Sequence, residues 1–157
     1  MDRISKHVSY KEAIRSNTAV RKGIDNTPDD DQLINMRLLA EYVFEPLRER
    51  ANNPIFISSF FRSIELNEVI GGSKTSQHCA EDGAAMDIDA DVYGGKSNSE
   101  LFGFIRDHLD YDTLIWEFGD DEEPAWVHVS FRVEGNRKRI LQALKTDSGT
   151  KYTTIIG

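Results

Sequence analysis

The sequence predicts an α+β domain in which helices pack on one side of an antiparallel sheet. Segments with apolar residues at steps of three and four, typical of helices, dominate the first part of the chain. Short runs rich in β-branched and aromatic residues dominate the last part, and this separation favours the α+β class. A length of 157 residues without an internal repeat or a low-complexity linker fits a single domain over residues 1–157.

The first predicted elements are helices. Residues 9–12, Ser-Tyr-Lys-Glu, have the form of a capping box, so we expect a short helix from about Tyr10 that fades by residues 16–17. A second start signal has Thr27 as the cap and Pro28 at the first helical position. The long helix that follows has an apolar stripe made of Leu33, Met36, Leu39, Ala40, Val43 and Leu47. Pro46 lies inside this pattern and predicts a kink or a weakened turn.

Two strands and a short helix are predicted next. Residues 55–59 are apolar on both faces, which indicates a strand in the interior of a sheet. Residues 64–70 fit a short helix that two glycines end. Residues 84–89 form a second strand, with Ala85, Asp87 and Asp89 on one face and Met86 and Ile88 on the other.

The last third of the chain predicts a helix and then strands. Ser97 or Asn98 caps a helix that continues through residue 109. Residues 112–118 and 126–133 form a hairpin with an acidic connection. Residues 139–156 fit two weaker strands around a turn at 147–149, although residues 140–145 are equally compatible with a helix.

Composition limits the class of partner and the compartment. The net charge of -8 argues against nucleic acid, whose phosphates are bound by clustered Lys and Arg. The single cysteine, Cys79, excludes an internal disulfide, and no apolar run approaches the ~20 residues that cross a bilayer. The first residues lack the apolar region of a signal peptide, so we expect a protein that is cytoplasmic as synthesised. We also expect a monomer and no membrane partner.

Three side chains have the chemistry of a metal site. A Gly/Ser-rich loop ends at His78, and the following strand carries Asp87. His128 lies on a later strand and points, with Ser130, away from the apolar residues beside it. Two histidines and a carboxylate are a ligand set of catalytic zinc sites. His7 and His108 have no such companions.

A family resemblance rests on the three segments that carry these residues. They read Ser76-Gln77-His78, Gly83-Ala-Ala-Met-Asp-Ile and Trp126-Val-His-Val-Ser. This pattern resembles the M15 peptidases, the zinc D-alanyl-D-alanine carboxypeptidases and phage endolysins with the Hedgehog/DD-peptidase fold, from about residue 9 to about residue 139. The resemblance implies that His78, Asp87 and His128 bind Zn²⁺.

The resemblance also implies residues that hold the substrate. In the family an arginine and a serine near the first histidine bind a substrate carboxylate, and Arg62 and Ser76 stand at the matching places. A guanidinium offers a carboxylate two parallel hydrogen bonds. The alternative for Arg62 is an ordinary surface ion pair.

The general base departs from the family pattern. Many members have an acidic residue three positions before the last histidine, where this chain has Ala125. We assign the role to Glu117, an acid within an apolar strand that we pair with the His128 strand. The alternative is that Glu117 is a solvated carboxylate on an edge strand. Glu122 and Glu123 lie in the connecting loop and are less suitable.

The loop after His78 is a second departure, because four residues separate it from Gly83 where the family commonly has two. The longer loop makes Glu81 and Asp82 rival ligands, and Asp89, on the same strand face as Asp87, is another. A Cys79 thiolate has the chemistry to bind zinc, but adjacent residues seldom point the same way, so we expect Cys79 to be a structural or exposed thiol.

The expected function is that of a zinc metallopeptidase that cuts bacterial peptidoglycan stem or cross-link peptides next to D-amino acids, as a carboxypeptidase or an endopeptidase. Such a protein reaches the wall after lysis or by separate export, as phage endolysins do, and a phage origin is a hypothesis. The alternatives are a non-enzymatic member of the fold that binds wall fragments or a protein partner, and a phage structural component.

Overall fold

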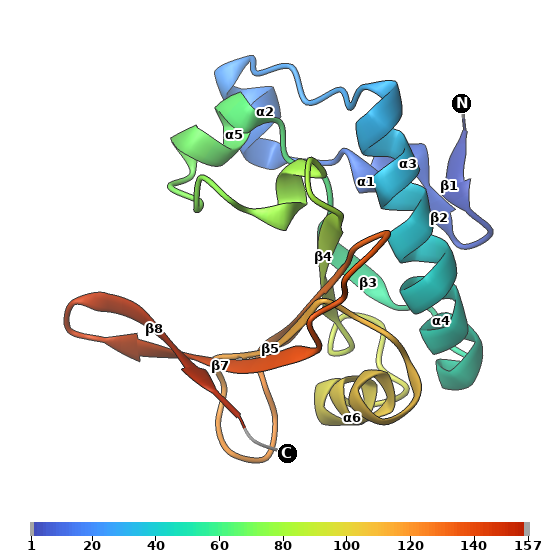
Figure 1. Cartoon of the computed structure of the whole chain (residues 1–157), viewed down its shortest axis with the longest axis vertical. Helices are drawn as coiled ribbons and strands as arrows, with labels where there is room; N and C mark the ends of the chain where they lie inside the picture. The colour runs from blue at the N-terminus through green and yellow to red at the C-terminus, as the bar shows by residue number, and fades with distance from the viewer. Residues whose placement is uncertain (1, 156–157) are drawn as a thin grey trace.

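The computed structural model describes residues 2–155 and contains a twisted six-stranded sheet (Figure 1). Its strands, in sheet order, are β3 (Phe56–Ser59), β4 (Ala84–Asp89), β6 (Trp126–Phe131), β5 (Thr113–Glu117), β7 (Arg139–Thr146) and β8 (Gly149–Thr154). Neighbours are antiparallel except β5 and β7, which are parallel. A separate small hairpin joins β1 (Arg3–Ser5) to β2 (Val8–Ser9). The predicted α+β class and the β5–β6 hairpin are confirmed.

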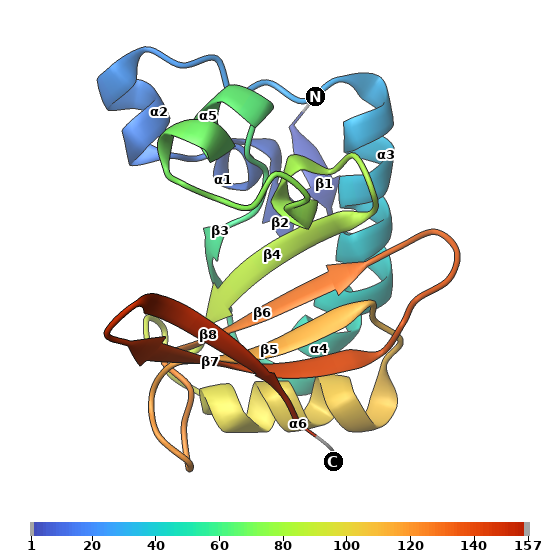
Figure 2. The same ribbon diagram turned by 60° about the vertical axis from the view of Figure 1, so that its left-hand side comes forward.

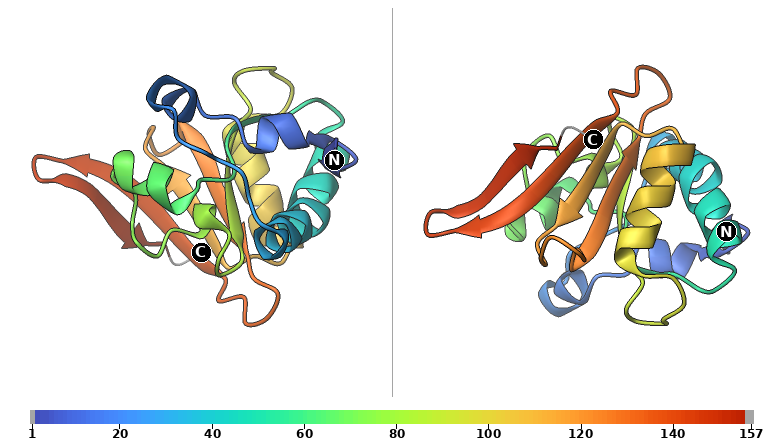
Figure 3. Two further views of the ribbon diagram at one scale, coloured as in Figure 1. Left: turned by 90° about the horizontal axis from the view of Figure 1, so that it is seen from above. Right: turned by 90° about the horizontal axis from the view of Figure 1, so that it is seen from below.

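The longest helices cover one face of the sheet. The helices are α1 (Tyr10–Ala13), α2 (Asn17–Lys22), α3 (Asp30–Leu39), α4 (Glu45–Ala51), α5 (Ile64–Val69) and α6 (Asn98–His108). Figure 3 shows α3, α4 and α6 on the same side of the sheet, whereas α2 and α5 lie together at the end of the molecule opposite α6 (Figure 2). The core lies under α3, α4 and α6, where Met86 and Ile88 of β4 are fully buried. The other face of β4 is left for the site.

The long predicted helix is confirmed, with a correction at its start. Its N-cap is Asp29, so the prediction of Thr27 as cap and Pro28 as first helical residue was wrong. Asp29 and Gln32 close a reciprocal capping box, which satisfies two free backbone N–H groups. A π-helical turn over Ala40–Phe44 separates α3 from α4 just before Pro46, which lacks an N–H and crowds the preceding turn.

The strand at residues 56–59 lies at the edge of the sheet, so the prediction that it is internal was wrong. Arg15 partly covers this edge, because its Nη2 donates to the carbonyl of Ile57 at 2.7 Å and its guanidinium lies 4.9 Å from the ring centroid of Phe56. An apolar strand at an edge is thus shielded by a long side chain.

Residues 139–154 form the β7–β8 hairpin, so the helical alternative for this stretch is wrong. The last residue of that prediction, residue 156, lies outside the described residues. The sequence did not predict β1, β2 or α2. Within residues 2–155 no helix has the length and apolar composition needed to cross a bilayer.

Candidate metal centre

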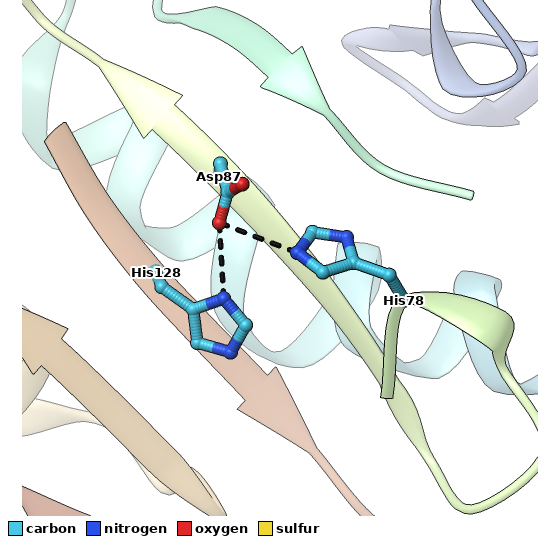
Figure 4. A group of neighbouring side chains, drawn as sticks. All are labelled: His78, Asp87 and His128. Atoms are coloured by element: carbon cyan, nitrogen blue, oxygen red, sulfur yellow. Dashed lines mark hydrogen bonds and ion pairs between the residues drawn. The ribbon is translucent and has the colours of Figure 1, made fainter. Parts of the chain in front are cut away.

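His78, Asp87 and His128 converge on the face of the sheet that the long helices leave open (Figure 4). His78 comes from a 3₁₀ turn, Gln77–Cys79, while Asp87 and His128 are direct partners in the β4–β6 register. One oxygen of Asp87, Oδ1, lies 2.9 Å from Nδ1 of His128 and 3.3 Å from Nε2 of His78. Strand pairing therefore brings together residues that are 41 positions apart in sequence.

The three side chains fit a divalent metal ion. Their ligand atoms all lie within 4.8 Å of one another. Ligands at ~2.0–2.2 Å from a tetrahedral zinc ion are roughly 3.3–3.5 Å apart, close to the separations found here. No second group of three such side chains occurs among residues 2–155. Two imidazoles and a carboxylate suit a borderline transition metal such as zinc.

A backbone carbonyl sets the orientation of His78. Nδ1 of His78 donates to the carbonyl oxygen of Phe60 at 2.8 Å, which leaves the lone pair of Nε2 directed at the site. Burial lowers the pKa of this imidazole below its ordinary value. His78 is therefore held neutral, in the tautomer that binds a metal.

Asp87 is held as a carboxylate. Burial raises the pKa of Asp87, but the nearby ring nitrogens of His78 and His128 outweigh burial, and the pKa lies well below its usual range. Nη2 of Arg62 lies 4.0 Å from the other carboxylate oxygen. The cluster thus combines a carboxylate with two imidazole rings.

The lengthened loop after His78 is anchored to α3. Asn35 Nδ2 donates to the carbonyl of Ala80 at 2.8 Å, and Gln32 Nε2 donates to that of Cys79 at 3.2 Å. Gly83 ends the loop with φ +72°, and a Cβ there would lie 2.2 Å from the carbonyl oxygen of Phe131. These contacts fix the path of the chain to Asp87, and no sequence pattern predicted the contacts of Gln32 and Asn35.

The rival ligands lie outside the cluster. Asp82 pairs with Arg132, and Asp89 accepts hydrogen bonds from Asn98 and from the backbone of Asp91. Glu81 is exposed. Cys79 is buried, and burial raises the pKa of its thiol, which disfavours the thiolate that binds metals.

The cluster lies in a pocket of about 810 Å³ that also contains Arg62, Ser76 and Glu117. Nη1 of Arg62 donates to Asn67 at 3.2 Å, and its side chain is only 18% exposed, so a surface ion pair does not describe it. The Ser76 hydroxyl accepts from the backbone N–H of His78 at 3.3 Å and thereby caps the 3₁₀ turn. Their roles in substrate binding remain predictions.

Glu117 lies in the interior of the sheet, on β5 between β6 and β7. It is 7% exposed, so the solvated edge-strand alternative does not describe it. Burial raises the pKa of Glu117 from 4.5 to about 7, with His128 and Arg62 lowering it and Asp87 raising it. A carboxyl group with a pKa near 7 is suited to proton transfer at neutral pH.

The loop acids are turned away from the pocket. Glu123 accepts hydrogen bonds from the hydroxyl and the backbone N–H of Ser99, at 2.6 and 3.0 Å. Glu122 is exposed. This leaves Glu117 as the better placed of the acids considered for the base.

One wall of the pocket comes from a hairpin that the sequence did not place near the site. The β7–β8 hairpin contributes Arg139, Leu141, Thr150 and Tyr152 to the lining. Alternation along residues 139–141 predicts that Arg139 and Leu141 share a face, but not that β7 pairs with β5 in parallel.

An α+β fold that carries two histidines and an aspartate in an open pocket defines a class of candidate metal-dependent hydrolases. A comparison with protein families places the chain in one family. The family model described as Peptidase M15 matches residues 6–130, which contain His78, Asp87 and His128. The chain belongs to the peptidase M15 family. The comparison with curated proteins found no match.

Proposed function

We propose that this protein is a zinc metallopeptidase that hydrolyses peptidoglycan stem or cross-link peptide bonds next to D-amino acids. The observation that carries the proposal is the convergence of His78, Asp87 and His128 beside Glu117 in one pocket. Family membership supports peptidase chemistry. The substrate rests on the sequence resemblance described above.

Six side chains of the pocket have roles in the proposed reaction. His78, Asp87 and His128 would hold zinc, which would supply a Lewis acid for the scissile carbonyl and for water. Glu117 takes a proton from the attacking water and later delivers it to the leaving amine. Arg62 and Ser76 hold the substrate carboxylate, and this orients the scissile bond.

The proposed setting is the bacterial cell wall, which the protein reaches after lysis or by separate export. The partner is a peptidoglycan peptide and not a nucleic acid, in keeping with the net charge of -8. A phage or prophage origin agrees with this setting.

A second candidate is a non-enzymatic member of the family that binds wall fragments or a protein partner. Ala125, at the position where many members carry the base, favours it. The position and the raised pKa of Glu117 favour the enzyme.

Digestion of purified muropeptides separates the two candidates. The enzyme releases D-alanine or cuts cross-linked dimers, and mass spectrometry identifies which bond is cut. Chelator treatment abolishes the products, and added zinc restores them. Zinc-loaded protein that binds the fragments without cleaving any of them would instead establish the non-enzymatic candidate.

A further inference from the structure

Arg139 places a guanidinium in the pocket without an acidic partner. Its Nε and Nη2 donate to the hydroxyl of Thr113 at 3.3 and 3.1 Å, and this contact fixes the side chain at the pocket wall. No carboxylate among residues 2–155 lies within 4.0 Å of its nitrogens. Arg139 is exposed, and its guanidinium retains N–H donors and a positive charge that no carboxylate neighbours.

The other arginines of the pocket are already paired. Arg137 binds Asp112 with two hydrogen bonds, Nε to Oδ1 at 2.9 Å and Nη2 to Oδ2 at 2.6 Å. Arg62 contacts Asn67 and lies beside Asp87. In an acidic protein, a positive charge that no neighbour neutralises is the natural contact for an anionic group of a ligand.

The sheet register sets the distance of Arg139 from the metal ligands. Ile115 of β5 is the register partner both of His128 on β6 and of Leu141 on β7. Arg139 lies two residues before Leu141 and on the same face. Adjacent strands are ~4.8 Å apart, so β7 lies roughly 10 Å from β6, which is the span of about three extended peptide residues.

We propose that Arg139 binds a second carboxylate of the substrate, in a subsite on the β7–β8 hairpin that is separate from the one at Arg62. The ligand class is a peptide with a free carboxylate two or three residues from the scissile bond. The proposal rests on the proposed peptidase function and adds a determinant of specificity to it. The matched family region ends at residue 130, so this subsite belongs to a part of the chain outside the family match.

A pair of peptides that differ in one group tests the subsite. One muropeptide carries the free carboxylate, and its partner carries a carboxamide at the same atom. We expect the full-length wild-type protein to prefer the acid by about tenfold in kcat/KM, mainly through KM, as for a charge-assisted hydrogen bond. In Arg139→Gln this preference disappears.

Lys151→Gln is the matched control. Lys151 lies on the same hairpin but between Thr150 and Tyr152, so it points away from the pocket that these two residues line. The Lys151→Gln substitution also removes one positive charge, and this variant is expected to keep the full preference for the acid over the amide. A tenfold preference retained in Arg139→Gln, or lost equally in Lys151→Gln, would overturn the proposal.

Binding measurements separate this proposal from the proposed function. Should the wild-type protein cleave neither peptide, the peptidase function is wrong, and titration calorimetry with the same two peptides still tests the subsite. Tighter binding of the acid that is lost in Arg139→Gln supports the subsite. Equal affinity of the wild-type protein for the acid and the amide refutes it.

Discussion

Asp87 and His128 lie directly opposite each other on β4 and β6, and Oδ1 of the first is 2.9 Å from Nδ1 of the second. Because the two residues are register partners, backbone hydrogen bonds between the strands set their separation. His78 reaches the same oxygen from a turn that is tied to α3 through Gln32 and Asn35. The candidate metal site is thus pre-organised by the sheet on two sides and by a helix on the third.

Removal of one ligand should abolish tight zinc binding. His128→Ala leaves one imidazole and one carboxylate, and we expect the zinc affinity to fall by more than about 100-fold. Zinc titration with a competing chelator measures this. His108→Ala, on α6, is the control and should bind zinc like the wild-type protein. Full zinc retention by His128→Ala would disprove the ligand set.

Replacement of the proposed base should separate catalysis from metal binding. Glu117→Gln keeps the shape of the side chain but cannot accept the proton, so kcat should fall by about 10²–10⁴-fold with zinc content unchanged. Glu123→Gln, whose carboxylate is bound to Ser99, should retain wild-type activity. Equal activity of Glu117→Gln and the wild-type protein would remove Glu117 from the mechanism.

The pH dependence of stability should report the burial of Glu117. A pKa raised from 4.5 to about 7 means that the folded state favours the protonated group. The contribution of the Glu117 carboxyl to the free energy of unfolding is complete below about pH 4.5 and is lost as the pH rises through about 7. This loss lowers the free energy of unfolding by an amount on the order of 3 kcal/mol.

Urea unfolding of metal-free protein checks this expectation. Glu117→Gln stays neutral at every pH, so its free energy of unfolding should rise relative to that of the wild-type protein between pH 4.5 and pH 8. A difference between the two proteins that does not change with pH would show that the carboxyl of Glu117 titrates normally.

Two glycines with the same backbone conformation allow a matched test of the loop. Gly83 and Gly135 have φ +72° and +74°, but a Cβ at Gly83 meets the carbonyl of Phe131, whereas one at Gly135 meets nothing within 4 Å. Gly135→Ala should cost about 1 kcal/mol, the strain of the left-handed conformation. Gly83→Ala should cost about 1–3 kcal/mol more, because the strand must move.

The same variants also connect the loop to the metal centre. Movement of β4 against β6 shifts Asp87 relative to His128, so Gly83→Ala should bind zinc more weakly while Gly135→Ala binds it normally. Unchanged stability and zinc affinity in Gly83→Ala would show that the loop tolerates a side chain at this position.

The sequence predicted the helices and strands that are determined by the pattern of neighbouring residues. Alternation along residues 84–89 correctly separated Asp87 from Met86 and Ile88, and the apolar stripe correctly predicted the long helix. The three residues of the cluster were also found, because each lies in a short motif of its own. Their roles as ligands stay a prediction until a metal is measured.

Non-local contacts could not be predicted in the same way. β3 lies at the sheet edge, where Arg15 from a distant segment donates to its backbone, and an apolar strand gives no sign of such a cover. The prediction of Thr27 as the cap failed because Asp29 competes for the same helix start, and the Asp29 N–H donates a second hydrogen bond to Oε1 of Gln32. Arg139 lines the pocket because β7 pairs in parallel with β5, and these two strands are not consecutive in the chain.

The most direct measurement titrates metal-free protein with zinc and follows muropeptide cleavage. We expect activity to rise linearly and to reach a plateau at about one zinc per chain for the wild-type protein. His128→Ala should stay inactive at the same zinc concentrations. Full activity of the metal-free protein, or no cleavage by the wild-type protein at saturating zinc, would show that this chain is not a zinc peptidase.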